Sequence, residues 1–422
     1  MTISYNWLSE YLPTKIEPGK LSKILTSIGL EVESLEKYES IKGSLQGLIT
    51  AEIVECEKHP DADKLKVTRV NTGTEILQVV CGAPNAAAGQ KVILATPGTT
   101  IYPANGEPLT LKKAKIRGVE SNGMICAEDE IGIGSSHDGI LVLPADTVIG
   151  QPAASLFEVK TDYIFEIGLT PNRMDAMSHL GVAKDVCAWL SYHDKKGTAA
   201  ILPYKNNFKT NGKPAPITIN VENNKDCPRY TGVSISNITV GESPEWLKMK
   251  LQAIGVKSIS NIVDITNFIL HETGQPLHAF DADKILGNTI IVKNMPEGSS
   301  FSTLDGKERK LYANDLMICN ANEPMCIAGV YGGIKSGVTD STKNIFLESA
   351  WFNPQAIRKT SLQHGLRTDA ATRFEKGVDI SNTVNVLKRA AELIVEICGG
   401  EINGDITDIY PIPVAPTAVG LK

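Results

Sequence analysis

The sequence predicts a multidomain α+β protein in which a β-barrel is inserted into a small α+β module and a larger α+β domain follows. The chain has 422 residues, which is enough for several domains at about 100 to 200 residues each. Short alternating strands separated by turns fill residues 40–146, whereas helical periodicity occurs on both sides of them. A stretch rich in Asn, Lys, Gly and Pro then separates this part from the rest of the chain.

The first module is expected to be discontinuous, with residues 1–39 and 147–197 on either side of the barrel. In its first part, apolar residues at helical spacing precede Gly29, which ends that helix before the strand-like sequence LEVESLE. In its second part, residues 162–190 predict a strand followed by a helix with an apolar stripe. The two parts therefore form one module interrupted by the strand-rich segment.

The inserted domain, residues 40–146, shows the pattern of an all-β barrel. Its predicted strands lie in LITAEIVECE, KLKVTRVNTG, ILQVVCGAPN, KVILATPGT, LTLKKAKIRG and NGMICAEDEIG. The segment LTLKKAKIRG carries four cations on alternating strand positions, Lys112, Lys113, Lys115 and Arg117, an arrangement that suits a groove following a phosphate backbone. Because the whole chain has a net charge of −6, nucleic acid would have to bind such local basic patches.

After a linker at 198–216, residues 217–400 mix strands and helices without regular βαβ repetition, which indicates a second α+β domain. Its last helix is closed by the pair Gly399 and Gly400. The tail, residues 401–422, is rich in Pro and Val, and no partner strand follows it in the sequence. We expect it to be the start of a following, truncated module.

The segment from Glu348 to Lys376 is the strongest candidate for a pocket wall. Asn353 and Pro354 form a natural helix start, Gly365 ends that helix, and Thr368 or Asp369 can cap the next one. The segment also carries a local excess of cations on an acidic chain. Two interpretations remain open here: a positive concavity for an anionic ligand such as nucleic-acid phosphate, or a solvated helix face.

Several function classes are disfavoured by the sequence. No apolar run approaches the roughly 18 residues that span a membrane, and the start lacks a secretory leader, so we expect a cytoplasmic protein. The eight cysteines show no CxxC pair and are expected to be reduced packing residues. No GxSxG elbow occurs, so a hydrolase of this sequence would use water as the nucleophile.

Other motifs have structural interpretations that we prefer. HPDADKL contains one His and two acids, but its Pro favours a turn and the acids lack calcium-loop spacing. His271 and His278 are separated by Gly274 and Pro276, which break any zinc-binding helix. GIGSSHDG and YGGIKSG lack the strand, loop and helix order of a nucleotide fingerprint. No metal ligand is predicted.

Three long motifs together carry a family resemblance. They are HPDADKLKVTRV through VVCGAPN to IRGVESNGMICAEDEIG; TPNRMDAMSHLGVAKDV; and VDITNFILHETGQPLHAFD through HGLRTDAATRFEKGVD. They resemble the β subunit of bacterial phenylalanine–tRNA ligase over nearly the whole chain and in the family's order. The resemblance implies that the barrel is a tRNA-binding OB-fold, that residues 217–400 are a B3/B4-type editing domain, and that residues 401–422 begin a B5-type module.

The resemblance also implies a function. A β subunit of this family supports phenylalanylation of tRNA(Phe) and hydrolyses mischarged Tyr-tRNA(Phe) after transfer. ATP-dependent synthesis resides in the α subunit, so we expect neither ATP nor metal in this fragment, although the full enzyme would use ATP and Mg²⁺. The expected partners are tRNA(Phe) and the α subunit in an α₂β₂ heterotetramer, with no membrane contact.

The family's site residues carry over by position. Glu348 is expected to accept the tyrosine phenol, with a surface salt bridge as the alternative role. His278 would orient water or bond the terminal ribose, with a satisfied structural histidine as the alternative, and Thr368 completes the catalytic group. The substrate-binding residues are Thr266, Asn267, Gly332, Gly333 and Ala370, and the tRNA-binding residues are Lys64, Lys66, Lys112, Lys113, Lys115 and Arg117.

Two finer expectations concern single positions, and two alternative functions remain. Backbone amides of Gly332 and Gly333 could donate to the developing oxyanion. Lys257 stands where many relatives carry arginine, so it keeps the charge but lacks the bidentate fork. The competing functions are a noncatalytic tRNA-binding scaffold and a free-standing RNA chaperone, of which the chaperone leaves residues 217–400 unexplained.

Overall fold

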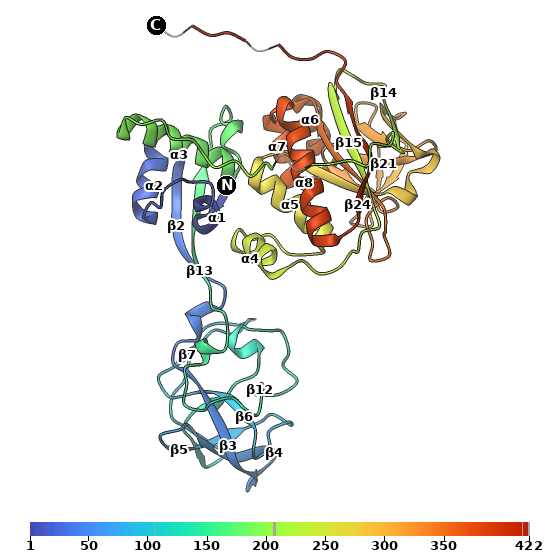
Figure 1. Ribbon diagram of the computed structural model, residues 1–422. Coiled ribbons are helices and arrows are strands. Elements are labelled where there is room, and N and C mark those ends of the chain that lie inside the picture. Colours follow the sequence, from blue (N-terminus) through green and yellow to red (C-terminus); the bar gives the residue numbers. More distant parts are fainter. Residues whose placement is uncertain (105, 206–207, 416, 421–422) are drawn as a thin grey trace. The chain divides into compact units, whose positions relative to one another are not determined.

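The computed structural model describes residues 1–104, 106–205, 208–415 and 417–420 (Figure 1). It contains two compact units, one formed by residues 37–162 and the other by residues 1–36 together with 163–422. The predicted α+β fold class, with a β-rich segment inserted into the chain of another unit, is confirmed. Residues 206–207 of the expected linker, and residues 416 and 421–422 of the expected following module, lie outside the described residues.

The N-terminal part of the larger unit contains a three-stranded sheet, in which β1 and β13 pair antiparallel, with helices against it. Its strands occur in the order β1, β13, β2. Side chains satisfy the exposed amides at the helix starts: Ser4 accepts from Trp7 N, and Ser178 accepts from Gly181 N. The elements are β1 (Thr2–Ser4), α1 (Tyr5–Ser9), α2 (Pro18–Ser27), β2 (Glu31–Glu39), β13 (Thr161–Gly168) and α3 (His179–Asp194).

The inserted unit is built on a six-stranded antiparallel sheet in the order β11, β6, β3, β4, β5, with β12 also paired to β6. In the described residues no ladder joins β5 to β11, so the expected barrel does not close by strand pairing. Isolated bonds from Asn122 N to Gln78 O and from Val80 N to the Ser121 hydroxyl bridge that side instead. The elements are β3 (Leu48–His59), β4 (Ala62–Asn71), β5 (Ile76–Cys81), β6 (Lys91–Ala95), β7 (Thr100–Ile101), β8 (Leu109–Thr110), β9 (Ala114–Ile116), β10 (Val119–Ser121), β11 (Met124–Ile125) and β12 (Val142–Leu143).

The second α+β region of the larger unit contains two main sheets and five helices. One sheet has the order β16, β23, β15, β24, and the other has the order β14, β17, β20, β21, β22. The strands are β14 (Thr218–Val221), β15 (Arg229–Ser236), β16 (Leu277–Asp281), β17 (Thr289–Asn294), β18 (Ser300–Ser302), β19 (Glu308–Lys310), β20 (Leu316–Cys319), β21 (Pro324–Ile327), β22 (Tyr331–Gly332), β23 (Ile345–Trp351) and β24 (Glu401–Ile409). The helices are α4 (Glu245–Ala253), α5 (Asn261–Thr273), α6 (Pro354–His364), α7 (Asp369–Lys376) and α8 (Thr383–Cys398).

Strand β23 separates two hydrophobic clusters because successive side chains on a strand point to opposite faces. Ile345 and Leu347 join the cluster formed with helices α5 and α8, which pack against this sheet in Figure 1. Phe346 and Ala350 join the cluster that contains the second sheet. Glu348 shares the face of Phe346 and Ala350, so the strand alternation places its side chain on the side of the second sheet.

Strand β24 lies in the tail, residues 401–422, that the sequence analysis expected to begin a following module. Its residues pair antiparallel with β15 and form the edge of the four-stranded sheet (Figure 1). The partner strand lies far earlier in the chain, so local sequence patterns could not reveal the pairing. Strand β24 therefore belongs to the same sheet as Glu348.

The N-terminal elements share a core with this region. The Trp7 ring stacks on the Phe268 ring with centroids 4.7 Å apart. The Tyr11 hydroxyl donates to Glu272 Oε1 at 2.7 Å, and Arg389 Nε donates to Glu272 Oε2 at 3.3 Å. Glu272 is buried, so these bonds offset much of the cost of removing its charge from water.

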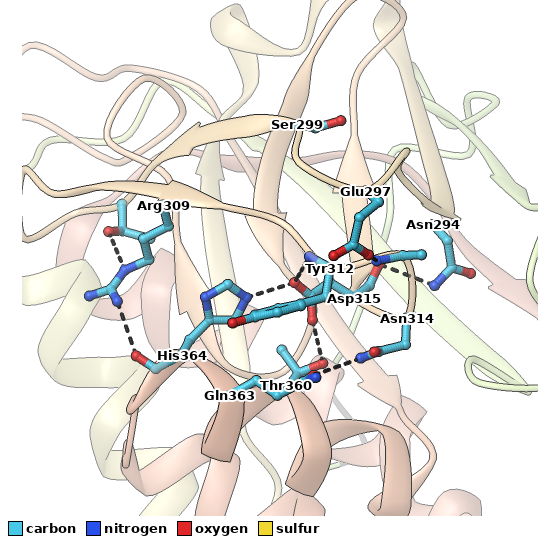
Figure 2. A network of polar contacts seen from close by, with 12 residues as sticks. Asn294, Glu297, Ser299, Arg309, Tyr312, Asn314, Asp315, Thr360, Gln363 and His364 are labelled. Atoms are coloured by element: carbon cyan, nitrogen blue, oxygen red, sulfur yellow. Dashed lines mark hydrogen bonds and ion pairs between the residues drawn. The ribbon is translucent and has the colours of Figure 1, made fainter.

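A buried acid fixes helix α6 on the strand region. Figure 2 shows Asp315 receiving bonds from Thr360 and His364 of α6 and from the backbone of Tyr312. Asp315 Oδ1 accepts from the Thr360 hydroxyl at 2.8 Å, and Oδ2 accepts from His364 Nε2 at 2.6 Å and from Tyr312 N at 2.8 Å. Helix α6 then ends at Gly365 with φ of 64°, as expected from the sequence. The network fixes the direction in which the chain enters α7.

Two further sequence expectations can be compared with the structure. All eight cysteines are unpaired, and all but Cys56 are buried, as expected for reduced packing residues. Within the described ranges, no helix is both long and apolar enough to cross a membrane.

Candidate functional site

A cavity of about 280 Å³ collects most of the residues predicted for substrate binding and catalysis. Both main sheets, helix α5 and the start of helix α7 contribute to its wall. The predicted residues that line it are Thr266, Asn267, His278, Gly332, Glu348, Thr368 and Ala370. These residues are far apart in the sequence, and the fold brings them to one surface.

Glu348 lies at the inner wall of the cavity with only 4% of its surface exposed. Its Oε2 accepts a hydrogen bond of 2.9 Å from the Tyr230 hydroxyl. Burial raises the pKa of Glu348 from 4.5 to about 8, and the Tyr230 hydrogen bond partly opposes that rise. The surface salt bridge considered for Glu348 is therefore wrong, because the carboxyl is buried against a neutral phenol.

His278 stands directly opposite Glu348 on the neighbouring strand β16. Its Nε2 is enclosed and has no hydrogen-bond partner in the part of the chain that the structure describes. Burial lowers the pKa of His278 to about 4, so the ring is neutral at neutral pH. A buried nitrogen without a partner is costly, and it does not match the satisfied structural histidine that we considered.

Thr368 lines the cavity, but its hydroxyl is already engaged. It caps helix α7 by accepting from Ala371 N at 3.0 Å, and it donates to Val330 O at 3.0 Å. Ala370, in the first turn of the same helix, contributes only a methyl group to the wall. This part of the site is therefore suited to shaping the cavity rather than to transferring protons.

The two glycines of the YGG sequence have different environments. A Cβ on Gly332 would lie 3.0 Å from His278 Cε1 and 2.9 Å from Leu304 Cδ1, so the absence of a side chain keeps this wall open. Gly333 instead lines a neighbouring cavity, and its N–H donates to Met325 O at 2.8 Å. Gly333 forms an isolated bridge with Thr303 just beyond strand β22, it does not line this cavity, and its amide is already bonded to Met325 O.

Helix α5 provides the opposite wall. The Thr266 hydroxyl donates to Val263 O at 2.7 Å within the helix, whereas the Asn267 amide makes no side-chain hydrogen bond with the described residues. Asn267 is therefore the α5 side chain available for a polar ligand. Lys257 is exposed and is not among the residues that line the cavity.

The cations of the 348–376 segment lie outside the cavity lining. Arg373 is buried and pairs with Asp369 at 2.7 Å, and Arg367 pairs with Glu375 at 3.4 Å. Of the two interpretations left open for this segment, the positive concavity does not match the cavity, whose lining in the described chain contains no Lys or Arg.

Sequence reasoning missed several residues of the site. Cys326, Tyr331 and Phe374 also line the cavity, and Tyr230 contacts Glu348 from behind. Phe374 follows from the helical spacing of α7, but no local signal marks Tyr230. It lies 118 residues before Glu348 and reaches it only through the pairing of β15 with β23.

The predicted tRNA contacts lie in the inserted unit. Lys64, Lys112, Lys113, Lys115 and Arg117 are exposed. Of the four cations between residues 112 and 117, only Lys115 belongs to a strand, so the expected alternation of these cations along one strand is wrong. Arg117 (φ 46°) and Gly118 (φ 84°) form the two-residue turn between β9 and β10, where both positive φ angles match a type I′ hairpin.

Two residues near this patch have structural roles. Lys66 Nζ donates to Ala86 O at 2.7 Å and to Pro84 O at 2.9 Å, which leaves it less available to phosphate than its exposed neighbours. His59 Nδ1 accepts from Asp61 N, so its Nε2 donates to Ile116 O at 3.0 Å. The preferred interpretation of HPDADKL as a turn is therefore confirmed.

Comparison with known proteins gives consistent matches over both parts of the chain. Residues 226–399 match the family model of the B3/4 domain, and residues 48–152 match that of a putative tRNA binding domain. The phenylalanine–tRNA ligase beta subunit of Bacteroides fragilis is 53% identical over 422 residues, which is all of this chain and 51% of that protein. The beta subunits of Porphyromonas gingivalis and Geobacter sulfurreducens are 52% and 43% identical, again over 100% of this chain and 51% of each relative. The chain thus spans about half the length of the curated relatives it matches.

Proposed function

Because the chain belongs to the family of phenylalanine–tRNA ligase beta subunits, we propose that it supports phenylalanylation of tRNA(Phe) and carries the site that hydrolyses mischarged Tyr-tRNA(Phe). The observation that supports this proposal most strongly is the buried pair of Glu348 and His278 at the wall of one cavity. A carboxyl without a charged partner, buried beside a histidine nitrogen without a partner, is costly for stability alone. A polar ligand would satisfy both groups.

The role of Glu348 follows from the difference between the two amino acids. Tyrosine differs from phenylalanine by one hydroxyl, and an apolar pocket rejects an added hydroxyl only weakly. A site built to bond that hydroxyl discriminates far better, because binding of phenylalanine leaves a buried polar group without a partner. Glu348 supplies the acceptor at the cavity wall, and the small residues Gly332 and Ala370 leave room for the aminoacyl group.

Hydrolysis requires a water molecule that attacks the ester carbonyl carbon. The new C–O bond forms as the carbonyl becomes an oxyanion, and the bond to the ribose oxygen then breaks, with the water proton passing to that oxygen. His278, with a pKa lowered to about 4, is a weak base at neutral pH. We therefore assign its Nε2 to positioning the water or the ribose rather than to storing the proton, and we assign the carboxamide of Asn267 to the polar part of the ligand.

The partner subunit, the assembly and the tRNA contacts of this chain are proposed from its family. The chain would act with an α subunit that carries ATP- and Mg²⁺-dependent synthesis, in an α₂β₂ assembly in the cytoplasm. The exposed cations Lys64, Lys112, Lys113, Lys115 and Arg117 would contact tRNA phosphates. Within the described residues, no group of three metal-ligating side chains converges, so no step here is assigned to a metal held by this chain.

A noncatalytic scaffold is the alternative function. It is favoured by the engaged hydroxyl of Thr368 and the engaged amide of Gly333, which remove two of the groups expected to act on the ester. A scaffold would still bind tRNA through the inserted unit. It would not release tyrosine from tRNA.

The deciding experiment measures deacylation of Tyr-tRNA(Phe) and Phe-tRNA(Phe) by the purified chain. Glu348→Ala tests the acceptor, and Glu401→Ala, an exposed acid of the same sheet, is the matched control. Fast release of tyrosine that is lost only in Glu348→Ala supports the proposal. Release at the uncatalysed rate, even with the α subunit added, would favour the scaffold.

A further inference from the structure

Tyr230 is the buried contact of Glu348 that the proposed reaction does not yet use. It lies in strand β15 with none of its surface exposed, and it does not line the cavity. Its hydroxyl donates to Glu348 Oε2 at 2.9 Å. Glu348 therefore stands between the cavity on one side and a fixed hydrogen-bond donor on the other.

The strand register explains why Tyr230 can reach this carboxyl. Glu348 pairs directly with Gly232, which has no side chain, while Tyr230 pairs with Ala350, two residues farther along the same face. The phenol thus approaches Glu348 along the diagonal of the strand pair. The Tyr230 ring packs in the same core cluster as Phe280 and Phe346, so it has little freedom to turn away.

The titratable groups around Glu348 keep one charge state near neutral pH, whereas Glu348 itself changes charge in this range. Tyr230, Cys227 and Cys326 have pKa values raised well above their ordinary values by burial, so they stay neutral. His278 has a pKa lowered to about 4 and is also neutral. Asp369, at the cavity wall on α7, is paired with Arg373. A pH-dependent change in ligand preference would therefore report on Glu348.

We propose that Tyr230 is a positioning residue that sets the preference of the cavity for a ligand hydroxyl, by holding one oxygen of Glu348 and favouring its ionised form as the acceptor. This inference rests on the proposed function, because it presumes that the ligand is a tyrosyl ester. Hydrogen bonds to charged groups contribute about 1.5 to 3 kcal/mol, which corresponds to roughly tenfold or more in an equilibrium constant. Loss of the Tyr230 hydroxyl should thus weaken recognition even though Tyr230 does not contact the ligand.

The test uses Tyr230→Phe, which removes one oxygen and keeps the ring in the core. We would measure binding of two hydrolysis-resistant adenosines, one carrying tyrosine and one carrying phenylalanine through a 3′-amide, from pH 6.5 to 9.5. The original chain should prefer the tyrosyl compound, with a preference that grows as pH rises through about 8. Tyr230→Phe should reduce the preference about tenfold and move the midpoint to higher pH, with little effect on the phenylalanyl compound.

Tyr11→Phe is the matched control, because Tyr11 is also buried and also donates to a buried carboxyl, that of Glu272, outside the cavity. A folding defect alone would affect both variants, whereas a role in recognition affects only Tyr230→Phe. Unchanged preference and midpoint in Tyr230→Phe would overturn the inference and leave the editing function intact. Equal binding of both adenosines by the original chain would also overturn the inference, because it presumes that the cavity prefers the tyrosyl compound. The deacylation assay then decides the proposed function separately.

Discussion

Replacement of Glu348 by Gln should make the larger unit more stable at alkaline pH, which is unusual for a residue placed in a functional site. Glutamine keeps the shape of the side chain and can still accept the hydrogen bond from Tyr230. It cannot ionise, however, so the native state no longer has to hold a charge at a position that is 4% exposed. The free-energy cost of burying the Glu348 carboxylate, which the substitution removes, depends on pH.

The size and sign of the effect follow from the pKa of Glu348. Between pH 4.5 and about 8 the unfolded chain has lost this proton while the native chain retains it. The unfolded state then binds fewer protons than the native state, so this group lowers stability as pH rises through that window. Since each pH unit corresponds to about 1.4 kcal/mol, the full loss by pH 9 is about 5 kcal/mol. The variant and the original chain should be similar near pH 4.5 and should differ by several kcal/mol at pH 9.

Urea unfolding at pH 5, 7 and 9 followed by tryptophan fluorescence measures this difference. All four tryptophans, Trp7, Trp189, Trp246 and Trp351, lie in the larger unit, so the signal does not report on the inserted unit. Glu272→Gln is the control, because Glu272 is buried but paired with a cation, and its replacement should give no alkaline gain. A difference between Glu348→Gln and the original chain that stays constant from pH 5 to 9 would refute the reasoning.

Three other outcomes are expected. Gly332→Ala should slow deacylation of Tyr-tRNA(Phe) at least tenfold while the chain remains folded by circular dichroism, because the new Cβ would lie 3.0 Å from His278 Cε1; full activity would remove this wall from the site. Asn353→Ala should lower the free energy of unfolding by about 1 kcal/mol in urea titrations, through loss of the cap on α6, and an unchanged midpoint would contradict that role. Replacing both Lys113 and Arg117 by Glu should weaken tRNA binding and reduce the slope of log K against log salt by about 1.5 in filter-binding assays, whereas an unaltered slope would place phosphate contacts elsewhere.

The sequence predicted the local elements of this chain well, because their signals lie within a few residues. Asn353 caps α6, Gly365 ends it, and Thr368 caps α7, as side-chain and backbone chemistry required. Gly29, with φ of 84°, follows the N-terminal helix α2 as its position predicted. The inserted β-rich segment and the α+β class followed in the same way from alternation, turns and helical spacing.

The sequence was less informative where strand pairing, rather than a local pattern, decides the contacts of a residue. Strand β24 pairs with β15, which lies far earlier in the chain, so residues 401–409 belong to the sheet that holds Glu348. Gly333 was grouped with Gly332 by sequence adjacency, but it follows the end of β22 and its amide donates to Met325 O. In the described residues the expected barrel does not close, because closure depends on pairing between the two edge strands β5 and β11, which no local pattern specifies.

By itself, the sequence determined which elements form and, through its long motifs, which family the chain resembles, because capping, turn chemistry and hydrophobic periodicity act over one or two turns of backbone. The tertiary structure alone decided the state of the site. It buried Glu348 against Tyr230, left His278 Nε2 without a partner and engaged the Thr368 hydroxyl. Charge state and hydrogen-bond availability depend on desolvation and on neighbours more than a hundred residues away, and only the packed sheets bring those neighbours together.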